Sequence, residues 1–194
     1  IAELRLATAC QRRGDSARAI ELLATAAPAL AGETRGQAYR LLADLSERSN
    51  QPQAAAIALE AFADAEDTHA APAARADAYH RAGELWRRAG ALDPAIRCLE
   101  AALRLVDDHL PALDGLELIE RDRGDLDRVA TILGRKVAAT ARQPTRQKAL
   151  LGRLAAVHEQ LGRPDVARAT LARALELDAG YRPALRALAD LARA

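Results

Sequence analysis

Aromatic residues are scarce in this sequence: they make up 3% of its 194 residues, whereas half of the residues are hydrophobic, mostly alanine and leucine. Valine, isoleucine and threonine, the residues typical of strands, are also sparse, which argues against a β-sheet. The composition therefore predicts an all-helical protein whose thin helices lie in close contact.

No charge of one sign prevails, because 28 basic and 27 acidic residues are interspersed and the net charge is +1. The sequence gives no electrostatic reason to expect a nucleic acid or an anionic membrane surface as partner. A run of about 18 apolar residues, which a membrane-spanning helix requires, is also missing. We therefore expect neither nucleic-acid binding nor membrane insertion.

Residues that could carry catalysis are few. Cys10 and Cys98 fall in different hairpins of the array described below, too far apart for a disulfide, and neither fixes the redox compartment. The histidines lack the spacing of a metal site, and the glycines stand singly rather than in a phosphate-binding loop. The histidines are His69, His80, His109 and His158. We expect no enzymatic activity, no cofactor and no metal.

The stretch AYHRAGELWRRAGALDPAIRCLEAALRL, residues 78–105, predicts two short amphipathic helices joined by a tight turn. The inner residues of the first helix recur at three- and four-residue steps. They are Tyr79, Ala82, Gly83 and Trp86. Gly90 follows at the point where the end of the first helix needs a residue with positive φ. Asp93 is the predicted N-cap of the second helix, and Pro94 is predicted to lie in its first turn. We interpret Tyr79 and Trp86 as core wedges between helices rather than as binding aromatics.

The same hairpin recurs along the chain, and each copy needs neighbours because it cannot bury its apolar stripe alone. The turn residues are separated by 36, 40, 34 and 38 residues; they are Gly14, Asn50, Gly90, Gly124 and Gly162. We predict one continuous solenoid over residues 1–194. It comprises about five hairpins, at approximately 1–33, 36–69, 76–109, 110–143 and 148–181, and a terminal helix, 182–194, that covers the apolar end.

The fourth hairpin departs from the pattern. Glu117 and Lys136 stand where the other hairpins place a small or apolar residue. We expect this hairpin either to be rotated relative to its neighbours or to loosen the stack locally.

The pattern of small and large residues resembles the tetratricopeptide repeat. In the third hairpin the matching residues are Tyr79, Ala82, Gly83, Trp86, Gly90, Ala95, Leu99 and Ala102. In the fifth hairpin they are Leu154, Ala155, His158, Gly162, Ala167, Leu171 and Ala174, followed by LELDAGY at Leu175–Tyr181. The resemblance covers essentially the whole chain and is weakest in the fourth hairpin. Three other repeat families are alternatives. A steadier period of about 35 residues would favour pentatricopeptide repeats, a longer unit would favour HEAT repeats, and a second loop glycine would favour Sel1-like repeats.

The resemblance implies a right-handed superhelix whose concave groove is lined by the first helix of each hairpin and receives a peptide or helix of a partner protein. The residues expected to face this groove are Arg5, Thr8, Arg12, Arg40, Asp44, Glu47, His80, Glu84, Arg87, Arg88, Leu118 and Gly152. A variant of the family grips a C-terminal carboxylate with Lys, Asn and Arg on successive first helices. The equivalent positions here do not match; they are Leu4 and Thr8, Arg40 and Asp44, and His80 and Glu84.

The polar strip on these first helices has two interpretations. Its arginines could hold partner carboxylates or backbone carbonyls through their planar forks. Alternatively, the strip is a solvated face with pairs such as Arg40–Asp44 and Glu84–Arg88, each contributing about 0.3 kcal/mol. An exposed Leu118, or the gap beside Gly152, could accept an apolar anchor of a partner.

Two functions follow as hypotheses: a module that binds a protein or peptide in its groove, and a spacer or sensor segment that contacts flanking domains of a larger protein. Self-association through uncapped ends is a third. Because the chain starts inside a helical pattern and stops within another, we expect a fragment of a longer protein. With Lys136 and Lys148 as the only lysines, the arginine bias indicates a high-GC bacterial genome. The compartment stays open, with the cytoplasm favoured.

Overall fold

The computed structural model describes residues 2–193, which leaves Ile1 and Ala194, the outermost residues of the predicted first hairpin and terminal helix, outside the description. Over the described residues the chain forms eleven α-helices and two short 3₁₀-helices, with no strand. The predicted all-α class is therefore confirmed. None of these helices is long and apolar enough to cross a lipid bilayer.

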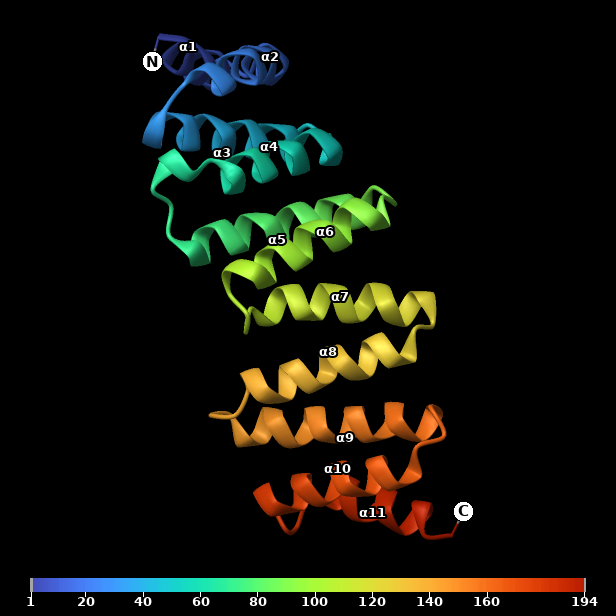
Figure 1. Cartoon of the computed structure of the whole chain (residues 1–194). Helices are drawn as coiled ribbons and strands as arrows, with labels where there is room; N and C mark the ends of the chain where they lie inside the picture. The colour runs from blue at the N-terminus through green and yellow to red at the C-terminus, as the bar shows by residue number, and fades with distance from the viewer. Residues whose placement is uncertain (1, 194) are drawn as a thin grey trace. The chain divides into compact units, whose positions relative to one another are not determined.

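The helices gather in two compact units, Ile1–Asp107 and Asp108–Ala194 (Figure 1). Unit 1 contains α1 (Ala2–Arg12), α2 (Ser16–Ala26), α3 (Gly32–Arg48), α4 (Pro52–Asp64), α5 (Pro72–Arg88) and α6 (Leu92–Leu105), with 3₁₀ turns η1 (Ala27–Ala29) and η2 (Glu66–Thr68). Unit 2 contains α7 (Leu110–Arg123), α8 (Leu126–Ala139), α9 (Pro144–Gln160), α10 (Pro164–Leu177) and α11 (Arg182–Leu191). Within each unit, helices that follow one another in sequence pack side by side. The single solenoid over residues 1–194 stays a prediction.

All five predicted turn residues adopt positive φ. The angles are +82° at Gly14, +56° at Asn50, +77° at Gly90, +75° at Gly124 and +68° at Gly162. This left-handed conformation costs little for glycine and is tolerated by asparagine, so each of these residues can end a helix and reverse the chain.

The predicted N-cap at Asp93 is wrong. Helix α6 begins at Leu92 with Ala91 in the cap position, and Asp93 lies in the first turn. In the first and fourth hairpins the aspartate follows the turn glycine directly, and Asp15 and Asp125 each accept a hydrogen bond of 3.0 Å from a backbone N–H of the next helix. Asp93 comes three residues after Gly90, too late to cap, although its charge still favours the positive end of the helix.

Small residues bring the helices of the third hairpin into close contact. A Cβ at Gly83 would lie 2.8 Å from Leu99 Cγ and 3.2 Å from the backbone oxygen of Ala95. Beside this contact, the half-buried Tyr79 and Trp86 pack against the core of unit 1, and their polar atoms donate to Asp64 and Glu60 of α4. The prediction that both aromatics are wedges between helices is therefore confirmed.

In the fourth hairpin, charged residues stand at positions where most other hairpins have small residues. Glu117 lies seven residues before its turn glycine; the residues at this place in the other hairpins are Ala7, Ala43, Gly83 and Ala155. Glu117 and Lys136 are buried, and Lys136 Nζ lies 2.7 Å from Glu117 Oε2. Helix α7 accordingly packs less closely on α8 than α5 does on α6. The rotation or loosening of this hairpin relative to its neighbours stays a prediction.

The two cysteines are free thiols that differ in burial. Cys98 is 3% exposed, and burial together with the charge of Glu60 raises the pKa of its thiol to about 12, whereas Cys10 is half-buried. At pH 8 only about one Cys98 thiol in ten thousand is ionised, and the thiolate is the reactive form. We expect iodoacetamide to alkylate Cys10 in the native protein and Cys98 only after denaturation, as followed by peptide mass spectrometry. Equal rates at the two thiols would contradict this assignment.

Candidate functional site

The first helices of unit 1 carry most of the predicted groove residues. Arg5 and Arg12 are exposed on α1, whereas the Thr8 hydroxyl donates to the Leu4 carbonyl of its own helix at 2.8 Å. On α5, His80 and Arg87 are half-buried, and Arg88 is exposed. These positions are consistent with a polar strip, but Thr8 already uses its hydroxyl within the helix.

Arg81 connects the first helices of two neighbouring hairpins. Its Nη2 lies 2.8 Å from Asp44 Oδ1 and 2.6 Å from Glu47 Oε2, both on α3. These hydrogen bonds, foremost that to Glu47, raise the pKa of Arg81 above its ordinary value. Sequence analysis did not identify this bridge. The signal that could have found this bridge is the spacing, since opposite charges separated by about one repeat face each other on adjacent first helices.

Three other predicted groove residues of α3 and α5 also have partners, namely Arg40, Glu84 and Arg87. The Arg40 guanidinium lies over the ring of Phe62, 5.2 Å from its centroid. Glu84 pairs with Arg87 at 2.9 Å, on the same helix. Much of the strip in unit 1 is thus engaged in contacts within the unit, with Asp44 paired to Arg81 and Glu84 to Arg87. A binding role for these residues stays a prediction.

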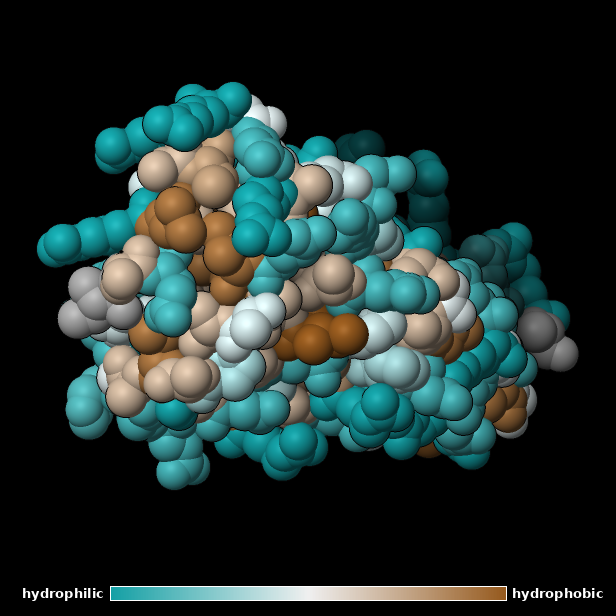
Figure 2. Space-filling view, turned by 90° about the horizontal axis from the view of Figure 1, so that it is seen from above, coloured by the Kyte–Doolittle hydropathy of each residue, from teal (hydrophilic) through white to brown (hydrophobic). Residues whose placement is uncertain are grey.

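The end of unit 1 formed by α1 and α2 exposes apolar groups. Figure 2 looks onto this end and shows brown apolar patches between hydrophilic side chains. Leu6 on α1 is 52% exposed. Self-association through this end stays a prediction.

Unit 2 contains the two apolar candidates, Leu118 on α7 and Gly152 on α9. Leu118 is 42% exposed, as predicted for a groove residue. A Cβ at Gly152 would lie 4.0 Å from the Tyr181 hydroxyl, so the gap beside Gly152 borders this side chain. Lys148 in turn covers the Tyr181 ring at 5.1 Å and pairs with Asp178.

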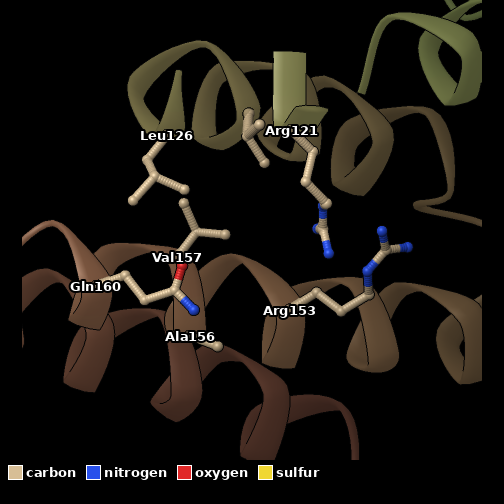
Figure 3. A pocket seen from close by; sticks show the side chains of 7 residues that line it. Arg121, Leu126, Arg153, Ala156, Val157 and Gln160 are labelled. Atoms are coloured by element: carbon tan, nitrogen blue, oxygen red, sulfur yellow. The ribbon is translucent and has the colours of Figure 1, made fainter. Parts of the chain in front are cut away.

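A pocket of about 340 Å³ opens between α7, α8 and α9 (Figure 3). We name it the Arg121–Arg153 pocket. It is lined by Arg121, Leu126, Val129, Arg153, Ala156, Val157 and Gln160. The guanidinium groups of Arg121 and Arg153 reach toward each other from α7 and α9, while the aliphatic side chains lie to one side of them. A pocket with an apolar lining and a few convergent polar groups has the general character of a ligand site.

Glu117 holds both arginines of the pocket. Its Oε1 accepts from Arg121 Nη2 at 2.9 Å and from Arg153, and its Oε2 lies against Lys136. Lys136 also pairs with Asp114 at 2.5 Å. Three positive and two negative groups share this network, which leaves one net positive charge beside the pocket.

Sequence reasoning missed Arg121 and Arg153. Arg121 follows Glu117 by four residues and therefore resembles an ordinary surface pair on one helix. The available signal was Glu117 itself, a charge at a position expected to be small, with Arg153 one repeat length further on. Among the described residues, no cluster of three or more histidine, cysteine, aspartate or glutamate side chains could hold a metal ion.

Comparison with known proteins identifies the architecture. A family model described as tetratricopeptide repeat matches residues 149–181. No curated protein sequence matches the chain significantly. Among solved structures, MamA is 18% identical to this chain with a TM-score of 0.57. The alignment covers 91% of this chain and 90% of the MamA chain. YrrB, described as a TPR protein with an unusual peptide-binding site, is 15% identical with a TM-score of 0.52, covering 96% and 90%.

BtubC from P. vanneervenii is 20% identical with a TM-score of 0.53, covering 91% of this chain and 79% of its own. At such identities these likenesses establish the fold, which is an α-solenoid of helical hairpins. The family match identifies a tetratricopeptide repeat at residues 149–181, and the likeness to these solved structures shows the fold of the chain. The right hand of its superhelix stays a prediction.

Proposed function

We propose that unit 2 of this chain binds an extended segment of a partner protein along its first helices α7 and α9, with the Arg121–Arg153 pocket as the principal contact. Tetratricopeptide repeats typically serve as protein-interaction modules. The observation that carries the proposal is the pocket, which combines an aliphatic lining with two half-exposed guanidinium groups from successive first helices. The peptide-binding site in the description of YrrB supports the same kind of use.

Unit 2 offers a better candidate than unit 1 because two of its arginines converge on one pocket and still retain donors. A guanidinium group has five N–H donors, and Arg121 and Arg153 each use part of theirs on Glu117. In unit 1, by contrast, Arg81 spans Asp44 and Glu47, and Arg40 lies on Phe62. We therefore assign the binding role to the pocket in unit 2, and a structural role within unit 1 to the paired residues of α3 and α5.

Selection from a phage-displayed library of random 12-residue peptides tests this function. We expect the protein to enrich peptides that bind in fluorescence anisotropy and that slow amide hydrogen exchange on the pocket face of α7 and α9. Failure to enrich any peptide above the unselected library would overturn the proposed function. Protection confined to α8 and α10 would overturn the assignment of the pocket.

A further inference from the structure

We infer that the segment bound in the Arg121–Arg153 pocket carries an acidic side chain beside an aliphatic one, within the peptide rather than at its C-terminus. This inference rests on the proposed function and names the chemistry of its ligand. It follows from three features: the orientation of the arginines, the charge of their network, and the composition of the pocket lining.

The arginines are held in place before any ligand arrives. One oxygen of the buried Glu117 accepts from both guanidinium groups, while their side chains remain 51% and 47% exposed. Guanidinium groups bind carboxylates through parallel N–H donors, and an anchored fork loses less conformational freedom on binding than a mobile one. Glu117 is therefore a positioning residue for the two arginines.

Lys136 keeps the site attractive for a second carboxylate. Glu117 alone would neutralise one arginine, but the buried Lys136 pairs with its other oxygen, 2.7 Å away. Counting Asp114, the network keeps one net positive charge. A ligand carboxylate thus meets two cations and a net attraction, whereas a basic peptide would be repelled.

The lining beside the arginines selects the neighbouring side chain. Leu126, Val129 and Val157 present aliphatic groups, and Figure 3 shows Leu126 and Val157 on the side away from the arginines. In an extended peptide, side chains two residues apart project to the same side at a separation of about 7 Å. One residue can then cover the aliphatic groups while the other reaches the guanidinium groups.

The two arginines belong to different first helices, which argues for an internal acidic residue. Arg121 extends from α7 and Arg153 from α9, and both guanidinium groups meet at Glu117, so one ligand carboxylate can contact both. A chain that runs along both first helices presents this carboxylate on a side chain and continues beyond it. A terminal carboxylate would require the chain to stop there.

Charge substitutions at Ala156 test the inference. Ala156 is exposed, lines the pocket and lies one helical turn from Arg153. The probes are fluorescein-labelled peptides from the selection, with amidated C-termini, and analogues in which Asn and Gln replace Asp and Glu. We expect Ala156→Glu to weaken binding about tenfold, because the introduced carboxylate occupies the arginines, and Ala156→Lys to preserve or strengthen it. The amide analogues should also bind about tenfold more weakly.

The two substitutions add side chains of similar size, so equal weakening by both would indicate a steric effect and overturn the acidic ligand. Amide analogues that bind as tightly as the acidic peptides would overturn it as well, while leaving the proposed function intact. A parallel library with free C-termini that alone yields binders would assign the site to a terminal carboxylate instead. A library without any binder counts against the proposed function itself.

Two control variants complete the design. Ala172→Glu makes the same charge change at an exposed alanine of α10 that does not line the pocket, and we expect it to change binding by less than about twofold. Arg121→Ala with Arg153→Ala should abolish the preference for acidic peptides. Thermal unfolding monitored by circular dichroism shows whether each variant is folded at the assay temperature, and Ala156→Lys provides an independent test if the double variant is not.

Discussion

Replacing Glu117 with alanine is expected to destabilise the protein by about 3 kcal/mol. Glu117 is 4% exposed and contacts Lys136, Arg121 and Arg153. Breaking a buried ion pair by removing one partner typically costs about 3–5 kcal/mol, because the other charge stays buried without compensation. The lower end applies here, since Lys136 keeps its contact with Asp114. Urea unfolding followed by far-UV circular dichroism measures the loss.

A second substitution, at Lys136, is expected to restore part of the stability that Glu117→Ala removes. Glu117→Ala combined with Lys136→Ala restores the small residues that the fifth hairpin has at the same two places, Ala155 and Ala174. Because the double variant removes both buried charges of this contact, we expect it to regain more than half of the lost free energy of unfolding. Glu159→Ala, at an exposed glutamate of α9, is the matched control and should change stability by less than about 0.5 kcal/mol. A double variant no more stable than Glu117→Ala would contradict the ion-pair account.

The helical hairpins could be predicted from the sequence because their signals are local. Gly90 and Asn50 mark turns because few residue types tolerate positive φ, wherever the rest of the chain lies. The three- and four-residue spacing around Gly83 likewise depends only on helix geometry. The N-cap at Asp93 shows the limit of such reasoning, because its position was wrong by two residues.

The candidate pocket could not be predicted because it depends on contacts between helices. Sequence analysis identified Glu117 and Lys136 as exceptions to the repeat pattern, but not that they pair with each other. Arg153 belongs to the next hairpin, and only the packing of α9 against α8 places it beside Glu117. The predicted groove residues Leu118 and Gly152 lie on the same two first helices, α7 and α9. The periodicity of the sequence therefore predicted the correct helices, but it did not indicate which of their arginines line the pocket.

Phe62→Ala should be the most destabilising substitution in unit 1, with an expected loss of about 3–5 kcal/mol. Phe62 is 4% exposed and lies twelve residues after Asn50; the equivalent residues of the first, third and fifth hairpins are Ala26, Ala102 and Ala174. The ring fills space that these hairpins close with smaller side chains, so its removal leaves a cavity. Trp86, the only tryptophan, packs against the same core, and its fluorescence follows the unfolding of unit 1. Phe62→Leu, which keeps most of the volume, should cost about 1 kcal/mol.

The same residue decides whether Arg40 is available to a partner. Its guanidinium lies 5.2 Å from the centre of the Phe62 ring, a geometry worth about 0.5–1 kcal/mol at exposed sites. A double-mutant cycle with Arg40→Ala and Phe62→Leu isolates this coupling, because leucine removes the aromatic face with little change in packing. Coupling in that range would assign Arg40 to the stability of unit 1. A value near zero would leave the Arg40 guanidinium available to a partner and make it a separate candidate contact in unit 1.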